Sequence, residues 1–233
     1  MLEVRDLWVE MDGVEVLRGL DLRIEPGERV ALMGRNGVGK STLMRAIAGL
    51  IEPRHGRIEV PGGCALLTQD PGDFLVRERV GDELPGEAGR AALAAVGLEG
   101  KLEADPRDLS GGERQRLALA IVLAGRTEPG LVMLDEPTRG MDRARKGELR
   151  ETIERLAAAG SAVIVATHDI EFAAEFAGRV ALLGRGEVVA DGDAAEVLSG
   201  GWYFATEVAR ILGVEGVVSP ERGAALLREK VSS

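Results

Sequence analysis

This chain of 233 residues has few aromatic residues, a single cysteine and fewer basic than acidic residues. Each of these shortages bears on which classes of protein the chain can belong to. Aromatics make up 3% of the sequence, and Cys64 is the single cysteine, so no internal disulfide can form. The net charge of −10 disfavours binding to nucleic acid, which rewards a basic surface. No apolar run approaches the roughly 18 residues that span a bilayer, and the first residues lack a signal-peptide pattern. A secreted protein and an integral membrane protein are therefore both disfavoured, whereas a peripheral role at a membrane is not.

The sequence contains short apolar runs that alternate with helical patterns. The runs at 29–33, 131–134 and 162–166 are typical of strands buried on both faces. Because a helical pattern follows each run, the chain predicts an α/β fold with a mainly parallel sheet. The remaining patterns predict antiparallel strands before residue 25, a strand over 56–69, helices over 88–96 and 111–124, and a hairpin over 180–190.

A glycine-rich loop, here called the phosphate loop, follows the first buried run and opens the first helix. Its sequence fits G-x-x-x-x-G-K-[ST], in which backbone N–H groups converge on phosphate oxygens at a helix N-terminus. Lys40 would supply a positive charge to the β- and γ-phosphates, Ser41 a hydroxyl to Mg²⁺, and Thr42 a further bond to phosphate. A plain glycine-rich turn is the alternative. The residues of this segment are Gly34, Arg35, Asn36, Gly37, Val38, Gly39, Lys40, Ser41 and Thr42.

Two acidic residues end the second buried run. At the carboxyl edge of that strand, Asp135 can hold Mg²⁺ directly or through water. Glu136 can polarise the water that attacks a γ-phosphate. A strand that simply meets a solvated turn gives the same pattern, so the functional interpretation depends on the phosphate loop.

A third segment places Ser110, Gly111 and Gly112 at the start of a helix. Such a start exposes backbone N–H groups and suits an anion. The alternative is that Ser110 is an ordinary helix N-cap. The residues alone do not identify the molecule whose phosphate would bind there.

Taken in order, these segments resemble the motifs of ATP-binding cassette (ABC) ATPases. The phosphate loop is similar to the Walker A motif, the acidic strand end to Walker B, and the serine-glycine helix start, with Glu113, to the family signature. Three single residues extend the resemblance, matching the Q-loop glutamine, the D-loop aspartate and the switch histidine: Gln69, Asp142 and His168.

The resemblance implies how the chain is organised. Residues 1–200 would form a nucleotide-binding domain with a P-loop NTPase core, an antiparallel β subdomain and a helical signature subdomain at about 70–124. Residues 201–233 would form a C-terminal helical extension, whose apolar residues fall on one helical face: Phe204, Val208, Ile211 and Leu212.

The resemblance also implies ATP and Mg²⁺ as ligands and a head-to-tail dimer with two ATP molecules at its interface. The signature residues of one chain would then act on the ATP bound by the other chain. The implied catalytic residues are Glu136, which orients water, His168, which contacts the γ-phosphate, and Gln69. The implied metal ligands are Ser41, Gln69 and Asp135.

One departure from the family concerns the nucleotide base. ABC ATPases usually stack adenine on an aromatic residue upstream of the Walker A lysine, and the matching place here holds Glu10 or Met11. Trp8 is close, but a single step along a strand turns a side chain to the other face. How adenine is held is therefore left open, with Met11 as a candidate packing partner.

Residues 69–74, residues 135–142 and the tail are similar to ATPase subunits of energy-coupling-factor importers, which take up vitamins or metal ions. That similarity implies a second ATPase in a homo- or heterodimer, a transmembrane coupling subunit and a substrate-binding membrane subunit. It places the chain in the cytoplasm, on the inner face of the membrane. Phe74, Leu75 and Val76 would meet the coupling subunit or belong to the core of the helical subdomain.

Two other functions fit the same motifs: a non-catalytic nucleotide-binding subunit that assembles a complex, and a soluble ABC ATPase without a membrane partner. The chain is also similar to the second half of fused two-cassette proteins, so a separate subunit and half of a longer protein both remain open.

Overall fold

The computed structural model describes residues 1–124, 129–199, 206 and 218. Within them the strands form two sheets, a three-stranded antiparallel sheet and a six-stranded sheet that is mainly parallel. The smaller sheet consists of β1 (Leu2–Met11), β2 (Val14–Ile24) and β4 (His55–Glu59). The larger sheet consists of β3 (Arg29–Met33), β5 (Cys64–Leu67), β6 (Leu131–Asp135), β7 (Ala162–Ala166), β8 (Arg179–Gly184) and β9 (Glu187–Asp193).

The order of the larger sheet is β5-β6-β7-β3-β8-β9. Its first five strands pair in parallel, and β9 closes one edge antiparallel to β8. The predicted α/β class with a mainly parallel sheet is therefore confirmed. Because parallel strands end at the same edge, the loops after β3, β5, β6 and β7 are brought together there.

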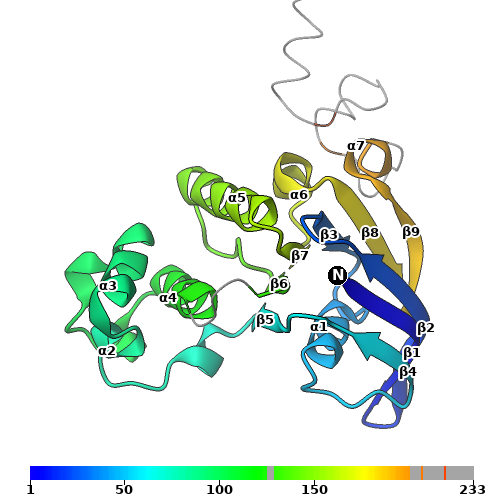
Figure 1. The fold of residues 1–233 in the computed structure, drawn as a ribbon, viewed down its shortest axis with the longest axis horizontal. Coiled ribbons are helices and arrows are strands. Elements are labelled where there is room, and N and C mark those ends of the chain that lie inside the picture. Colours follow the sequence, from blue (N-terminus) through cyan, green and yellow to red (C-terminus); the bar gives the residue numbers. More distant parts are fainter. Residues whose placement is uncertain (125–128, 200–205, 207–217, 219–233) are drawn as a thin grey trace, which may run out of the picture.

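Both faces of the larger sheet are covered, which explains why its strands are apolar at nearly every position. In β3, Val30 and Leu32 pack on one face, toward α1 (Lys40–Ile47) and the smaller sheet, while Ala31 and Met33 pack on the other. The second face is covered by α4 (Gly111–Ala124), α5 (Arg143–Ala158) and α6 (Ile170–Phe176), as Figure 1 shows.

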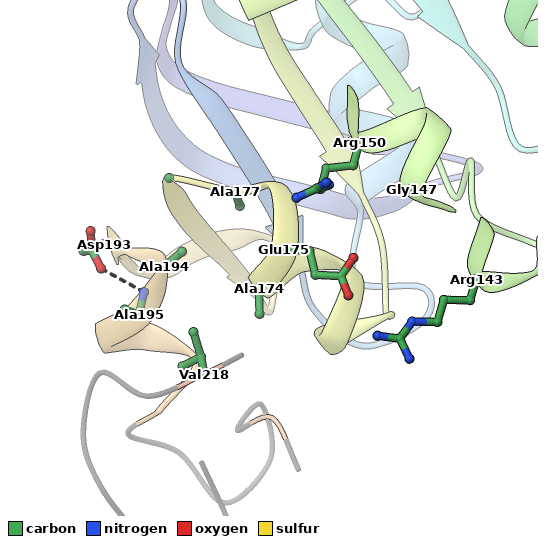
Figure 2. A pocket seen from close by; sticks show the side chains of 11 residues that line it. Arg143, Gly147, Arg150, Ala174, Glu175, Ala177, Asp193, Ala194, Ala195 and Val218 are labelled. Atoms are coloured by element: carbon green, nitrogen blue, oxygen red, sulfur yellow. Dashed lines mark hydrogen bonds between the residues drawn. The ribbon is translucent and has the colours of Figure 1, made fainter. Parts of the chain in front are cut away.

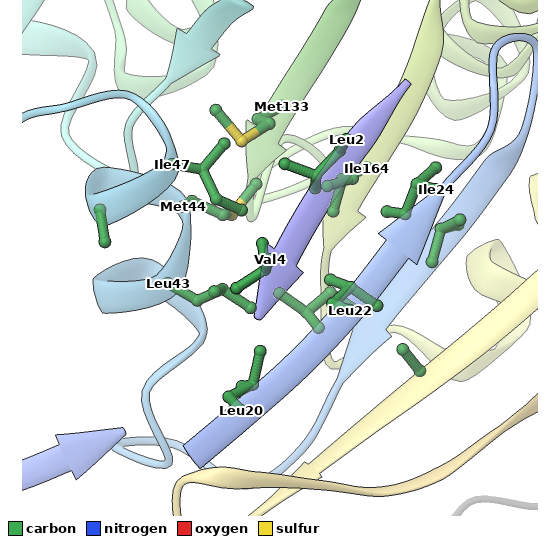
Figure 3. Close-up of a cluster of buried hydrophobic side chains, with 14 of the residues drawn as sticks. Leu2, Val4, Leu20, Leu22, Ile24, Leu43, Met44, Ile47, Met133 and Ile164 are labelled. Atoms are coloured by element: carbon green, nitrogen blue, oxygen red, sulfur yellow. The ribbon is translucent and has the colours of Figure 1, made fainter. Parts of the chain in front are cut away.

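The smaller sheet and α1 form one core with the larger sheet. Figure 3 shows Leu2 and Val4 of β1 between Met44 of α1 and Leu22 of β2, with Ile164 of β7 close by. All five side chains are nearly inaccessible to water. This packing fixes the smaller sheet against the strands that carry the phosphate loop.

A separate hydrophobic cluster holds the helical part of the chain, which stands at one end of the larger sheet (Figure 1). It joins α2 (Val80–Glu83), α3 (Gly86–Ala95) and α4 through Val80, Leu93 and Leu117, which are fully buried. Short 3₁₀ helices at Pro71–Phe74, Glu99–Lys101 and Pro106–Asp108 connect these elements, and α7 (Ala194–Val197) follows β9.

The strand predicted over 56–69 is wrong as a single element. It is two strands, β4 and β5, which lie in different sheets. Gly62 and Gly63 stand between them with φ of 85° and 71°, a left-handed backbone that ends an extended strand. Those two glycines let the chain leave one sheet and enter the other.

The segment after Gln69 is partly buried. Phe74 and Leu75 pack in apolar clusters, whereas Val76 is 77% exposed. The first two residues therefore belong to the core of the protein, and only the third lies free on the surface. The predicted C-terminal helical extension over 201–233 lies outside the described residues, apart from Thr206 and Val218. Among the residues that are described, no helix is long and apolar enough to cross a membrane.

Candidate functional site

A cavity of about 560 Å³ lies at the edge of the larger sheet where the parallel strands end. The phosphate loop follows β3, Gln69 follows β5, the acidic pair ends β6, and His168 follows β7. Segments more than a hundred residues apart in sequence, such as those of Asn36 and His168, therefore meet in one place. The lining residues are Asn36, Gly37, Gly39, Lys40, Ser41, Thr42, Gln69, Asp135, Glu136, Arg139 and His168.

The phosphate loop curls in a way that needs glycine at two positions, Gly34 and Gly39. Gly34 has a φ of 148°, and a Cβ there would lie 2.6 Å from the carbonyl oxygen of Leu183. Gly39 has a φ of 113°, and a Cβ there would lie 2.8 Å from Cδ2 of Leu17. Both contacts are too short for a side chain, so these glycines allow the loop to pass close to its neighbours.

Lys40 lies at the first turn of α1 and is 7% exposed. Its Nζ donates to the carbonyl oxygen of Gly34 at 2.9 Å and to that of Arg35 at 3.3 Å. The ammonium group thus bridges two carbonyl groups of the loop, and Lys40 lines the cavity in which phosphate oxygens would lie.

Asp135 is 4% exposed at the end of β6. Burial raises the pKa of its carboxyl, the negative charge of Glu136 adds to the rise, and a hydrogen bond from the Ser41 side chain opposes it. Oxygen donors from Ser41, Asp135 and Gln69 are of the kind that Mg²⁺ prefers. The described part of the chain holds no group of three His, Cys, Asp or Glu that could bind a metal alone. Mg²⁺ would therefore also need phosphate or water oxygens, as is usual for this ion.

Glu136 and His168 are hydrogen-bonded across the cavity, with 2.8 Å between Glu136 Oε2 and His168 Nδ1. The Glu136 side chain is 10% exposed and the His168 side chain 72% exposed. Glu136 has a φ of 50°, rare for a residue with a side chain, and its N–H donates to the carbonyl oxygen of Ala166 at 2.8 Å. Backbone strain of this kind gathers at functional sites, which supports a chemical role for this carboxylate.

The predicted signature residues lie outside this cavity. Ser110 donates to Glu113 Oε2 through its backbone N–H and through its hydroxyl, both at 2.8 Å, and Glu113 N–H donates back to Ser110 Oγ at 3.3 Å. This reciprocal capping box begins α4. The two Ser110 donors also hold the pKa of Glu113 below its usual range. Neither these residues nor Gly111 and Gly112 contribute to the cavity wall.

Asp142 is the N-cap of α5, where its side chain accepts from Arg145 N at 2.9 Å, and it does not line the cavity. Arg139 does line it, although the sequence analysis gave this residue no role. Its N–H donates to the carbonyl oxygen of Glu136 at 3.3 Å, and its position three residues after Glu136 was the signal that could have found it. Trp8 donates Nε1 to Asp6 Oδ1 at 2.8 Å, and Met11 is 39% exposed at the end of β1.

A second cavity, of about 600 Å³, lies between α5, α6 and α7 (Figure 2). Arg143 and Arg150 come from α5, Glu175 from α6, and Asp193 begins α7. It contains none of the predicted site residues, and its charges are of both signs. The phosphate loop, the acidic pair and His168 therefore line the first cavity and not the second.

Comparisons with known proteins agree with this geometry. Residues 17–139 match the sequence family described as ABC transporter. A Streptomyces coelicolor protein assigned by name to the ABC transporter ATP-binding proteins is 46% identical over 90% of this chain, which spans 41% of that relative. The energy-coupling factor transporter ATP-binding protein of Methanothermobacter thermautotrophicus is 34% identical over 84% of this chain and 72% of its own length.

Solved structures show the same fold. An ATP-binding subunit of an ABC transporter superposes with a TM-score of 0.76 at 26% identity, covering 97% of this chain and 99% of that one. A dimeric, post-hydrolysis ATP-binding cassette bound to ADP and Pi has a TM-score of 0.75 at 24% identity, covering 83% and 99%. The chain spans only about two fifths of the length of the first curated relatives it matches.

Proposed function

Because the chain belongs to the ABC transporter family of ATP-binding proteins, we propose that it binds and hydrolyses ATP to drive a transporter. The observation that carries this proposal is the single cavity shared by the phosphate loop, the acidic end of β6 and His168. Sequence motifs can match by chance, but their meeting at one sheet edge requires the fold to place them there.

The roles of the cavity residues follow from their chemistry. Lys40 and the loop N–H groups hold the phosphates, while Ser41, Asp135 and Gln69 would hold Mg²⁺, which neutralises phosphate charge. Glu136 accepts a proton from the attacking water and aims it at the γ-phosphate. His168, already bonded to Glu136 and largely exposed, contacts the γ-phosphate from the open side.

The cavity of one chain is completed by a second chain. Ser110, Gly111 and Gly112 present a helix start to solvent away from their own cavity, so they would serve the ATP of a partner. The dimeric neighbour bound to ADP and Pi supports this arrangement. Two copies related by a two-fold axis would form two such sites, because each contact in a two-fold interface occurs twice.

The transporter is an importer of the energy-coupling-factor type in this proposal, with the chain on the inner face of the membrane. The similarity to the Methanothermobacter ATP-binding protein supports the subtype, and exposed Val76, just after the Q-loop residue Gln69, offers an apolar contact for a membrane subunit. The test is co-purification with a transmembrane coupling subunit. Recovery with Val76 intact and loss with Val76→Asp supports it, whereas equal recovery of both contradicts this contact.

Glu136→Gln tests the catalytic assignment. The amide keeps the size of the side chain but cannot accept the proton of water, so the variant should bind Mg-ATP, form a stable dimer and lose at least about a hundredfold in kcat. Light scattering with ATP and a phosphate-release assay measure the two effects. Hydrolysis by the variant at the wild-type rate would show that Glu136 is not the base.

A further inference from the structure

An ion pair joins α5 to the start of α6 beside the cavity. Lys146 Nζ donates to Asp169 Oδ2, and the two side chains are 31% and 20% exposed. A charged hydrogen bond that is mostly shielded from water holds its partners more firmly than a surface pair does. Neither residue lines the cavity, and neither belongs to a motif named above.

Asp169 directly follows His168 and is held from three sides. Its Oδ1 caps α6 by accepting from Phe172 N at 3.0 Å, its other oxygen accepts from Lys146, and its own N–H donates to Thr167 Oγ1 at 3.0 Å. The Thr167 side chain is itself fully buried. The backbone that carries His168 is therefore fixed largely by what Asp169 contacts.

The other end of the ion pair leads back to Asp142. The N–H of Lys146 donates to the carbonyl oxygen of Asp142 at 3.0 Å, in the first turn of α5. A continuous series of contacts therefore leads from Asp142 through Lys146 and Asp169 to His168. His168 is in turn hydrogen-bonded to Glu136.

We propose that Lys146 is a positioning residue that aims His168 at Glu136 by restraining Asp169. Without the ammonium group, Asp169 still caps α6 but loses its only restraint from α5 among the described contacts. The peptide before it then gains freedom, and the His168 ring leaves the orientation that places Nδ1 2.8 Å from Glu136 Oε2. The consequence for hydrolysis rests on the proposed function; the consequence for the histidine does not.

Nitrogen NMR of the imidazole rings tests the positioning directly. The sequence contains two histidines, so His55→Ala assigns the His168 signals without ambiguity. Lys146→Met should move the His168 Nδ1 resonance toward its position in Glu136→Ala, and Lys146→Arg should restore it. Arg150→Met removes a more exposed cation from the same helix and should change nothing. An unmoved His168 resonance in Lys146→Met would overturn the proposal.

Steady-state hydrolysis supplies the second readout. Lys146→Met should lower kcat roughly ten- to a hundredfold, as expected when a reacting group is misplaced by about 1 Å, with KM for ATP and the thermal midpoint close to wild type. Asp169→Asn should match it, because asparagine still caps a helix but lacks the charge, and the double variant should be no worse than either. Equal losses in kcat and in ATP affinity would contradict a positioning role. A wild-type chain without hydrolysis in any assembly, but with the NMR result as expected, would refute the proposed function alone.

Discussion

At the scale of single residues, the structure explains which positions the chemistry restricts. Gly34 and Gly39 are fixed by contacts of 2.6 and 2.8 Å that a methyl group would make. Glu136 is fixed by its positive φ and by its bond to His168. Asp135 differs, because its burial works against the ionised form that Mg²⁺ would need. An ionised Asp135 would therefore carry a cost to the stability of the fold.

Asp135→Asn makes that cost measurable. Burial raises the pKa of Asp135 in the folded chain, so the folded state holds the proton to a higher pH than the unfolded state does. The stability that protonation contributes is lost as pH rises through the folded pKa, and at pH 7 the ionised carboxylate destabilises the fold. Asp135→Asn should therefore have a higher thermal midpoint than wild type at pH 7 without nucleotide, with the difference shrinking in acid.

Thermal unfolding with and without Mg-ATP provides the control. Mg-ATP should stabilise the wild type more than the variant, since the variant lacks a metal ligand. Asp12→Asn, in an exposed turn, should leave the midpoint unchanged. A lower midpoint for Asp135→Asn than for wild type at pH 7 would show that Asp135 stabilises the fold as a carboxylate.

At the scale of elements, the parallel strands were predictable and the connections were not. The runs at 29–33, 131–134 and 162–166 form strands that are buried on both faces. Such strands are apolar at nearly every position, so an apolar run in the sequence predicts them. The division of 56–69 into β4 and β5 was missed, because two adjacent glycines do not say to which sheet each side belongs. The Lys146–Asp169 pair was also missed, since it joins residues 23 positions apart through tertiary packing alone.

Arg179 shows how one side chain can hold several elements. At the start of β8 its guanidinium donates to both carboxylate oxygens of Asp191 at 2.6 and 2.7 Å, and to Glu28 and the carbonyl oxygen of Arg23 at 3.1 and 3.0 Å. β8, β9 and the turn before β3 therefore meet at this residue. With 28% of the side chain exposed, these bonds are largely shielded from water.

Arg179→Met should lower the free energy of unfolding by roughly 1.5–3 kcal/mol, since it removes both guanidinium donors to Asp191 and leaves Glu28 with the N–H of Glu25. Urea denaturation measures the change. Arg57→Met removes an exposed cation 3.5 Å from Glu59 and should cost less than about 0.5 kcal/mol. Equal losses of unfolding free energy in the two variants would show that the Arg179 hydrogen bonds stabilise the fold no more than an exposed ion pair does.

At the scale of the whole molecule, the residues that resemble the ABC motifs lie in two separate places. The cavity contains Lys40, Asp135, Glu136 and His168, while Ser110 begins a helix outside it. The sequence predicted both groups through the resemblance to ABC ATPases, and the fold separates them within the chain. The central claim is therefore that hydrolysis requires two chains, each completing the site of the other.

Mixing two inactive variants tests that claim most directly. Lys40→Ala removes the phosphate-binding charge but keeps the signature residues, and Ser110→Arg blocks the signature but keeps the cavity. In a head-to-tail dimer of the two, the Lys40→Ala chain supplies an intact signature to the ATP bound by the Ser110→Arg chain. The account predicts that the mixture releases phosphate from ATP while neither variant does so alone. A mixture as inactive as its components, under conditions where wild type is active, would contradict the account, as would full activity of Ser110→Arg by itself.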